Sequence, residues 1–181
     1  MKKSKRRQDS LIPLSRQHHY ALVLCLRINR GLKTNGGDIN WLRSQSRKAT
    51  QFFESDLVPH FQAEEAVLFP AMSAMLNAAQ LLSSLLDEHK NIREQIGLLR
   101  RLEMEREPAV IAKALIDLAS MLEAHIRKEE RQLFPIYEDQ ASSTNDAAVG
   151  EKILELIGTA SQPSDPSLLN LATQVQKRTS E

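Results

Sequence analysis

The chain carries one pattern twice: a histidine, a glutamate at position i+4, a second glutamate, and then Leu-Phe-Pro. The two copies begin with His60 and Glu64 and with His125 and Glu129. On a helix such a pair shares one face, with Cβ atoms roughly 6 Å apart. Two helices of this kind that face each other bring together two imidazoles and two carboxylates. This is the ligand set of a dinuclear metal site in a helical bundle.

The segments that must position these residues are long and amphipathic. Glycine, proline and aromatic residues are scarce, and stretches typical of strands are missing. We therefore expect an all-α protein, an up-down-up-down four-helix bundle with one or two short C-terminal helices. Asp38 is a good N-cap for the second helix, and Pro59 should kink or interrupt it. The expected helices are Leu14 to Gly31, Asp38 to Met75, Gln80 to Met104 and Pro108 to Glu138.

Further candidate ligands lie on the other two helices, His18 near the start of the first and His89 early in the third. In an up-down-up-down bundle these positions meet at one end with the late parts of the second and fourth helices. Independent core histidines have no reason to gather there. His18 is favoured over His19 because it is in line with the apolar positions Leu14 and Leu22.

The residue types indicate which ions fit such a pocket. Burying Glu64 and Glu129 is costly unless a positive charge compensates, and a metal pair that both carboxylates bridge would supply it. The alternative is a metal-free network of His–Glu hydrogen bonds. Nitrogen and oxygen ligands without thiolates fit iron, manganese or zinc. Because Cys25 is the single cysteine, an internal disulfide is excluded, and this favours a reducing, cytoplasmic location. Its position on the apolar face of the first helix is interpreted as that of a buried, inert thiol.

The order of these motifs resembles that of the hemerythrin-like HHE cation-binding domain family, over roughly residues 11–140. The strings that carry the resemblance are Leu14-Ser-Arg-Gln-His18-His19, His60-Phe-x-x-Glu64-Glu65 and His125-x-x-x-Glu129-Glu130. The resemblance implies a four-helix bundle that holds two iron ions (Zn or Mn as purified being alternatives), bridged by two carboxylates and an oxo or hydroxo group. The metal ligands that it implies are His18, His60, Glu64, His89, His125 and Glu129.

One position departs from the richer pattern of the oxygen-carrying hemerythrins, which resemble this chain but have a second histidine one turn after the third-helix ligand. Arg93 stands there instead. One metal should therefore lack a protein ligand and be open to O2, peroxide or nitric oxide. Arg93 could orient a bridging carboxylate or form a surface ion pair with a nearby glutamate. Glu65 and Glu130 point about 100° away from the ligand glutamates, as partners of the ligands or toward solvent.

The remaining segments suggest flanking extensions. Residues 1–10 form a basic tail that is expected to be disordered, and residues 141–181 form a C-terminal extension. Helices are expected from Val149 to Thr159 and from Ser167 to Gln176, as a partner or homodimer surface. Phe69 and Phe134 should pack the end of the bundle, and Pro70 and Pro135 should mark bends beyond the site.

The composition narrows the function. A formal net charge of +1 argues against a nucleic-acid partner, and the longest apolar runs are too short for a membrane span or an export signal. No nucleophile, phosphate loop or nucleotide fingerprint indicates an enzyme class. We expect a di-iron protein that binds or reacts with O2, peroxide or nitric oxide, or that senses iron. The alternatives are a structural or regulatory bundle in which metal only stabilises the fold, and iron storage or transfer.

Overall fold

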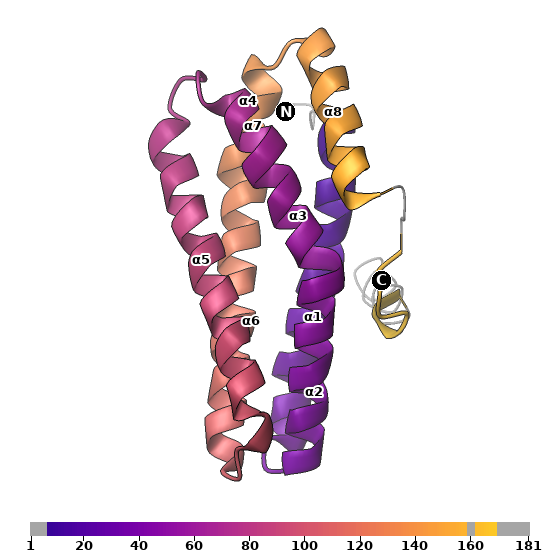
Figure 1. Ribbon diagram of the computed structural model, residues 1–181, viewed down its shortest axis with the longest axis vertical. Coiled ribbons are helices and arrows are strands. Elements are labelled where there is room, and N and C mark those ends of the chain that lie inside the picture. The colour runs from indigo at the N-terminus through magenta and orange to yellow at the C-terminus, as the bar shows by residue number, and fades with distance from the viewer. Residues whose placement is uncertain (1–6, 159–161, 170–181) are drawn as a thin grey trace, which may run out of the picture.

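The computed structural model describes residues 7–158 and 162–169. All of the regular structure in these residues is helical. The chain crosses the length of the molecule in alternating directions and forms a four-helix bundle (Figure 1). The fold class expected from the sequence is therefore confirmed. None of the described helices is long and apolar enough to cross a membrane.

The first helix, α1 (Ile12–Asn35), is longer than expected at both ends and follows a short 3-10 turn, η1 (Asp9–Leu11). Pro13 lies in its first turn, where a missing N–H costs nothing. Asp38 then caps α2 (Ile39–Phe52), as predicted, because its side chain accepts hydrogen bonds from the backbone N–H groups of Asn40 and Trp41.

The second helix of the bundle does not break at Pro59. It continues from α2 through the π-helical turn η2 (Phe53–Leu57), α3 (Val58–Ala63), a second π turn, η3 (Glu64–Leu68), and α4 (Phe69–Met72). Proline removes a backbone donor and clashes with the carbonyl of the preceding turn. Here the π turn η2 directly precedes α3, and the helix continues through Pro59 without interruption.

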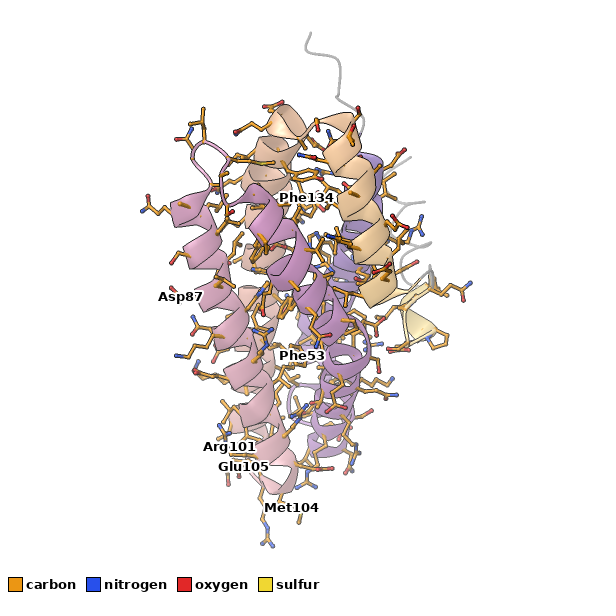
Figure 2. The ribbon with its side chains drawn as sticks, turned by 45° about the horizontal axis from the view of Figure 1, so that its top comes forward. Phe53, Asp87, Arg101, Met104, Glu105 and Phe134 are labelled. Atoms are coloured by element: carbon orange, nitrogen blue, oxygen red, sulfur yellow. The ribbon has the colours of Figure 1, made fainter. Side chains whose placement is uncertain are left out.

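The third and fourth helices follow the same plan. α5 (Ala79–Arg101) ends in the 3-10 turn η4 (Leu102–Met104), and the fourth helix comprises α6 (Pro108–Lys128), the π turn η5 (Glu129–Leu133) and α7 (Phe134–Gln140). Figure 2 shows Phe134 inside one end of the bundle and Met104 and Glu105 at the other end, in the turn between α5 and α6.

The apolar interior is divided into two clusters. The larger one contains Leu24, Ile92 and Leu118 and fills the half of the bundle near the α5–α6 turn. The smaller one fills the other half and contains Leu14, Leu68, Leu133 and Phe134. The histidines and glutamates singled out from the sequence form a buried polar layer beside both clusters.

The flanking segments are more closely integrated than the sequence suggested. The first C-terminal helix, α8 (Ser143–Ile157), begins earlier than predicted and packs against α3, η1 and η3 (Figure 1). Residues 7–10, assigned to a disordered tail, are ordered: Ser10 is buried and donates a hydrogen bond to Asp146. Residues 1–6 lie outside the described residues. The helix expected from Ser167 to Gln176 lies mostly outside them as well.

Candidate metal centre

Six side chains meet in the buried polar layer, and none is more than 2% exposed. α1, α3, α5 and α6 each contribute a histidine, and the two glutamates stand at the first positions of the π turns η3 and η5. Every candidate ligand inferred from the sequence is among them. The six are His18, His60, Glu64, His89, His125 and Glu129.

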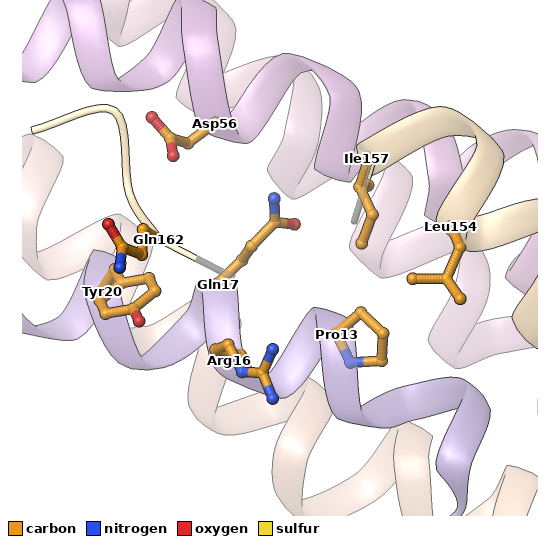
Figure 3. A pocket seen from close by; sticks show the side chains of 9 residues that line it. Pro13, Arg16, Gln17, Tyr20, Asp56, Leu154, Ile157 and Gln162 are labelled. Atoms are coloured by element: carbon orange, nitrogen blue, oxygen red, sulfur yellow. The ribbon is translucent and has the colours of Figure 1, made fainter. Parts of the chain in front are cut away.

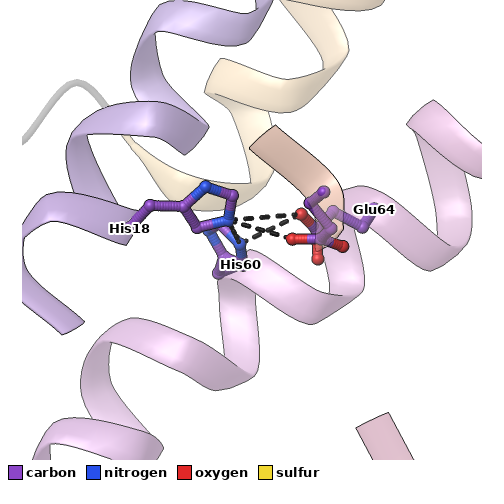
Figure 4. Close-up of side chains that lie close together, drawn as sticks. His18, His60 and Glu64 are labelled. Carbon is purple, nitrogen blue, oxygen red and sulfur yellow. Dashed lines mark hydrogen bonds and ion pairs between the residues drawn. The ribbon is translucent and has the colours of Figure 1, made fainter. Parts of the chain in front are cut away.

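The first half of the centre is formed by His18, His60, Glu64 and Glu129, whose donor atoms all lie within 4.8 Å of one another. The Nε2 atoms of His18 and His60 are 3.0 Å apart. Nε2 of His18 lies 3.0 Å from Oε2 of Glu129. Nε2 of His60 lies 3.0 Å from Oε1 of Glu64 (Figure 4).

The second half repeats this arrangement with His89 and His125, whose Nε2 atoms are 3.2 Å apart. Nε2 of His89 is 3.3 Å from Oε2 of Glu64, and Nε2 of His125 is 3.4 Å from Oε2 of Glu129. Glu64 and Glu129 thus belong to both halves. Because Glu64 presents one oxygen to each half, its carboxylate is placed to bridge two cations.

The other nitrogen of each histidine, Nδ1, lies within hydrogen-bond distance of an oxygen from a neighbouring helix. Each bundle helix supplies such an oxygen, so the four contacts run around the centre as a closed ring. We call these four residues the outer ring. They are Glu130 for His18 at 2.9 Å, Gln17 for His60 at 2.9 Å, Glu65 for His89 at 2.7 Å and Glu88 for His125 at 3.0 Å.

Basic side chains neutralise the carboxylates of the outer ring. Arg7 lies 2.5 Å from Glu130, Arg93 lies 2.8 Å from Glu65, and Lys128 forms an ion pair with Glu88. The second interpretation of Arg93, an ion pair with a nearby glutamate, is therefore the one that the structure shows. Arg7, assigned from the sequence to a solvated tail, instead holds a residue of the outer ring.

These contacts determine the tautomer of the imidazoles. An ionised carboxylate or an amide oxygen only accepts, so Nδ1 must carry the proton and donate it. In a neutral imidazole Nε2 is then a bare lone pair. Four such lone pairs converge on Glu64 and Glu129, whose oxygens have no hydrogen-bond donor among the described residues as long as all four imidazoles are neutral. Such a buried cluster needs positive charge, and its nitrogen and oxygen donors are ones that fit a bound metal ion.

The electrostatics of the metal-free cluster agree with this demand for positive charge. Burial opposes a charge on His18, but its contacts with Glu129 and Glu130 outweigh burial and raise its pKa to about 10. Burial likewise opposes ionisation of Glu64, but the contacts with His60 and His89 hold its pKa well below the usual range. Protons therefore occupy part of the space that a metal ion would take.

Three phenylalanines cover the histidines. Phe61 stacks on His89 with ring centres 3.8 Å apart, and the ring centre of Phe69 lies 5.7 Å from that of His89. Phe134 stacks on His18 with ring centres 5.5 Å apart. The prediction that Phe69 and Phe134 pack the bundle end was incomplete. In a π turn residue i+5 returns to the face of residue i, and each of these two follows a ligand glutamate by five positions.

A small pocket lies beside the centre, where α1 approaches η2 and α8 (Figure 3). It has a volume of about 40 Å³, room for a few water molecules. Gln17 lines it together with Pro13, Asp56 and Ile157. The same side chain contacts His60, so it stands between this pocket and the buried histidines.

Sequence reasoning missed Gln17 and Glu88 in the outer ring. A signal was available, because each directly precedes a candidate histidine ligand, as Glu65 and Glu130 directly follow the candidate glutamates. Which neighbouring histidine each would contact depends on how the helices are arranged, which spacing alone does not give. His19 is half-buried and packs edge-on against Tyr20, outside the candidate centre.

Comparison with known proteins agrees with this arrangement. The family model described as the hemerythrin HHE cation-binding domain matches residues 13–137, and it matches again over residues 80–155. No curated protein and no solved structure gives a significant match. The first match spans all six candidate ligands and covers most of the chain, so the chain belongs to the hemerythrin HHE cation-binding domain family.

Proposed function

We propose that the six buried side chains hold two metal ions, natively iron, as a non-haem di-iron centre. The spacing of the donor atoms carries this proposal. Ligand bonds of about 2.1 Å at right angles place neighbouring donors about 3 Å apart. The closest nitrogen–nitrogen and nitrogen–oxygen pairs are 3.0 Å apart in the first half. In the second half they are 3.2 to 3.4 Å apart.

The division of roles follows from the two halves. His18 and His60 would bind one ion, His89 and His125 the other, and Glu64 and Glu129 would bridge both. When bound, a ferrous pair supplies two electrons to a small oxidant such as O2 or peroxide, or a binding position for nitric oxide. The outer ring fixes the imidazoles with Nε2 toward the two glutamates, where it would bind the metal, and the phenylalanines packed on the imidazoles would limit the access of water.

Arg93 favours reactivity or sensing over reversible oxygen carriage. It occupies the position where the oxygen carriers would have a further histidine, and its guanidinium is turned to Glu65 and stacked over Phe61. Each metal would then have two imidazole ligands and two bridging carboxylates. Four protein ligands leave coordination positions of an iron ion open to a small exogenous ligand or oxidant.

The test is metal analysis of anaerobically purified protein by mass spectrometry, followed by absorption spectra before and after air and azide. We expect about two irons per chain and charge-transfer bands that respond to both. Glu129→Ala should remove the bands, while Glu103→Ala, which removes an exposed carboxylate near the turn between α5 and α6, should keep them. A colourless zinc protein that ignores air and azide but loses stability with chelator would instead show a structural metal. More than two irons would indicate storage.

A further inference from the structure

We infer that Gln17 makes the two metal positions unequal, so that the position formed by His18 and His60 is the weaker one. This inference rests on the metal pair of the proposed function. Three residues of the outer ring are carboxylates, and Gln17 alone is an amide. Since His60 is its partner, the difference falls on one half of the centre.

The chemistry of the hydrogen bond gives the direction. A carboxylate that accepts from Nδ1–H draws the proton toward itself and raises the basicity of Nε2, which strengthens the bond from Nε2 to a metal. A neutral amide oxygen accepts the same proton without adding negative charge. Gln17 therefore orients His60 as well as a carboxylate would, with 2.9 Å between Oε1 and Nδ1, but makes it a poorer donor.

The surroundings of the ring agree with this assignment. Each carboxylate of the ring is half-buried and is paired with a basic side chain, Arg7, Arg93 or Lys128. The amide needs no such counterion. Gln17 also lines the pocket of about 40 Å³ between α1, η2 and α8, so water has room close to this half of the centre (Figure 3).

The opposite half provides a matched comparison. Glu88 holds His125 as Gln17 holds His60, and both precede a histidine ligand directly in the sequence. Gln17→Glu and Glu88→Gln exchange the same two functional groups with almost no change in volume. The first variant should strengthen the weaker position, and the second should weaken the stronger one. Residues that support metal ligands in this way typically change metal affinity about 10–100-fold.

The experiment is an anaerobic Co2+ titration of the whole chain against a competing chelator, followed through the ligand-field bands. In the unmodified protein we expect two ions to bind in two separate steps. Coupling through Glu64 and Glu129 also separates the steps, so the change between variants is the decisive quantity. Gln17→Glu should raise the weaker affinity about 10–100-fold, and Glu88→Gln should lower the stronger one by a similar factor.

Glu94→Gln removes a carboxylate from an exposed position on the same helix as Glu88 and should leave both steps unchanged. Two bound ions with the same separation of steps in Gln17→Glu and in the unmodified protein would overturn this inference and leave the metal pair intact. Fewer than two ions in the unmodified protein would overturn the metal pair and this inference with it. Circular dichroism establishes that each variant is folded before it is titrated.

Discussion

At the scale of single residues, the carboxylates of the centre differ in whether a basic side chain pairs with them. The outer carboxylates Glu65, Glu88 and Glu130 each have an arginine or lysine neighbour, whereas Glu64 and Glu129 face only the Nε2 atoms of the histidines. Two buried carboxylates are costly unless protonated histidines or metal ions compensate their charge. The charge that they demand is the physical reason why this layer suits cations, and why protons and metal ions compete for it.

Burial suppresses ionisation of the thiol of Cys25, which lies in the same helix as His18. Burial, aided by the negative charge of Glu123, raises the pKa of its thiol to about 12. The thiol is neutral when folded and ionises more readily when unfolded, so its contribution to stability is present below about pH 9 and is lost as the pH rises toward 12.

We therefore expect Cys25 to react with a disulfide reagent at pH 8 about three orders of magnitude more slowly in the folded than in the unfolded protein, from the difference in thiolate fraction. The measurement is the rate of labelling with and without guanidinium chloride. Rapid labelling of the folded chain would show that the thiol is accessible and activated, contrary to the inert role predicted for it.

At the scale of helices, the sequence predicted the four bundle helices but not the π turns that precede three of the prolines. Pro59, Pro70 and Pro135 each lie six residues after the start of a π turn. Helical periodicity and caps predicted the four helices and the end of the bundle where the ligands meet. A proline signals only that the backbone hydrogen-bond ladder is disturbed, and either an interruption of the helix or a π turn can follow. Packing against neighbouring helices decides between them, which local sequence does not encode.

The cap at the start of α2 can be tested apart from the metal centre. Asp38→Ala removes the acceptor of the Asn40 and Trp41 N–H groups, which should cost about 1 kcal/mol and lower the melting temperature by about 2–4 °C. Asp38→Asn keeps the cap and should melt close to the unmodified protein. Since the loop lies about 25 Å along α1 from His18, metal content should not change in either variant. Loss of metal in Asp38→Ala alone would contradict this separation.

At the scale of the whole molecule, the centre is supported from both directions along the bundle. The larger apolar cluster lies on one side of the polar layer, and the smaller cluster lies on the other. The smaller cluster is completed by α8, whose Val149 and Ile153 are buried against it. The sequence placed this helix in a separate extension because its apolar positions did not reveal which surface they cover.

The docking of α8 predicts a sharp difference between two of its apolar residues. Ile153 is fully buried and Leu156 is 41% exposed. Ile153→Ala should cost about 2–5 kcal/mol, because it leaves a cavity in the smaller cluster, whereas Leu156→Ala should stay within about 0.5 kcal/mol. Denaturant unfolding of both variants measures the difference. Equally small effects would show that α8 is undocked in solution. A dimer that Leu156→Ala disrupts would support the partner surface expected for this helix, since an exposed leucine contributes to stability only where another chain covers it.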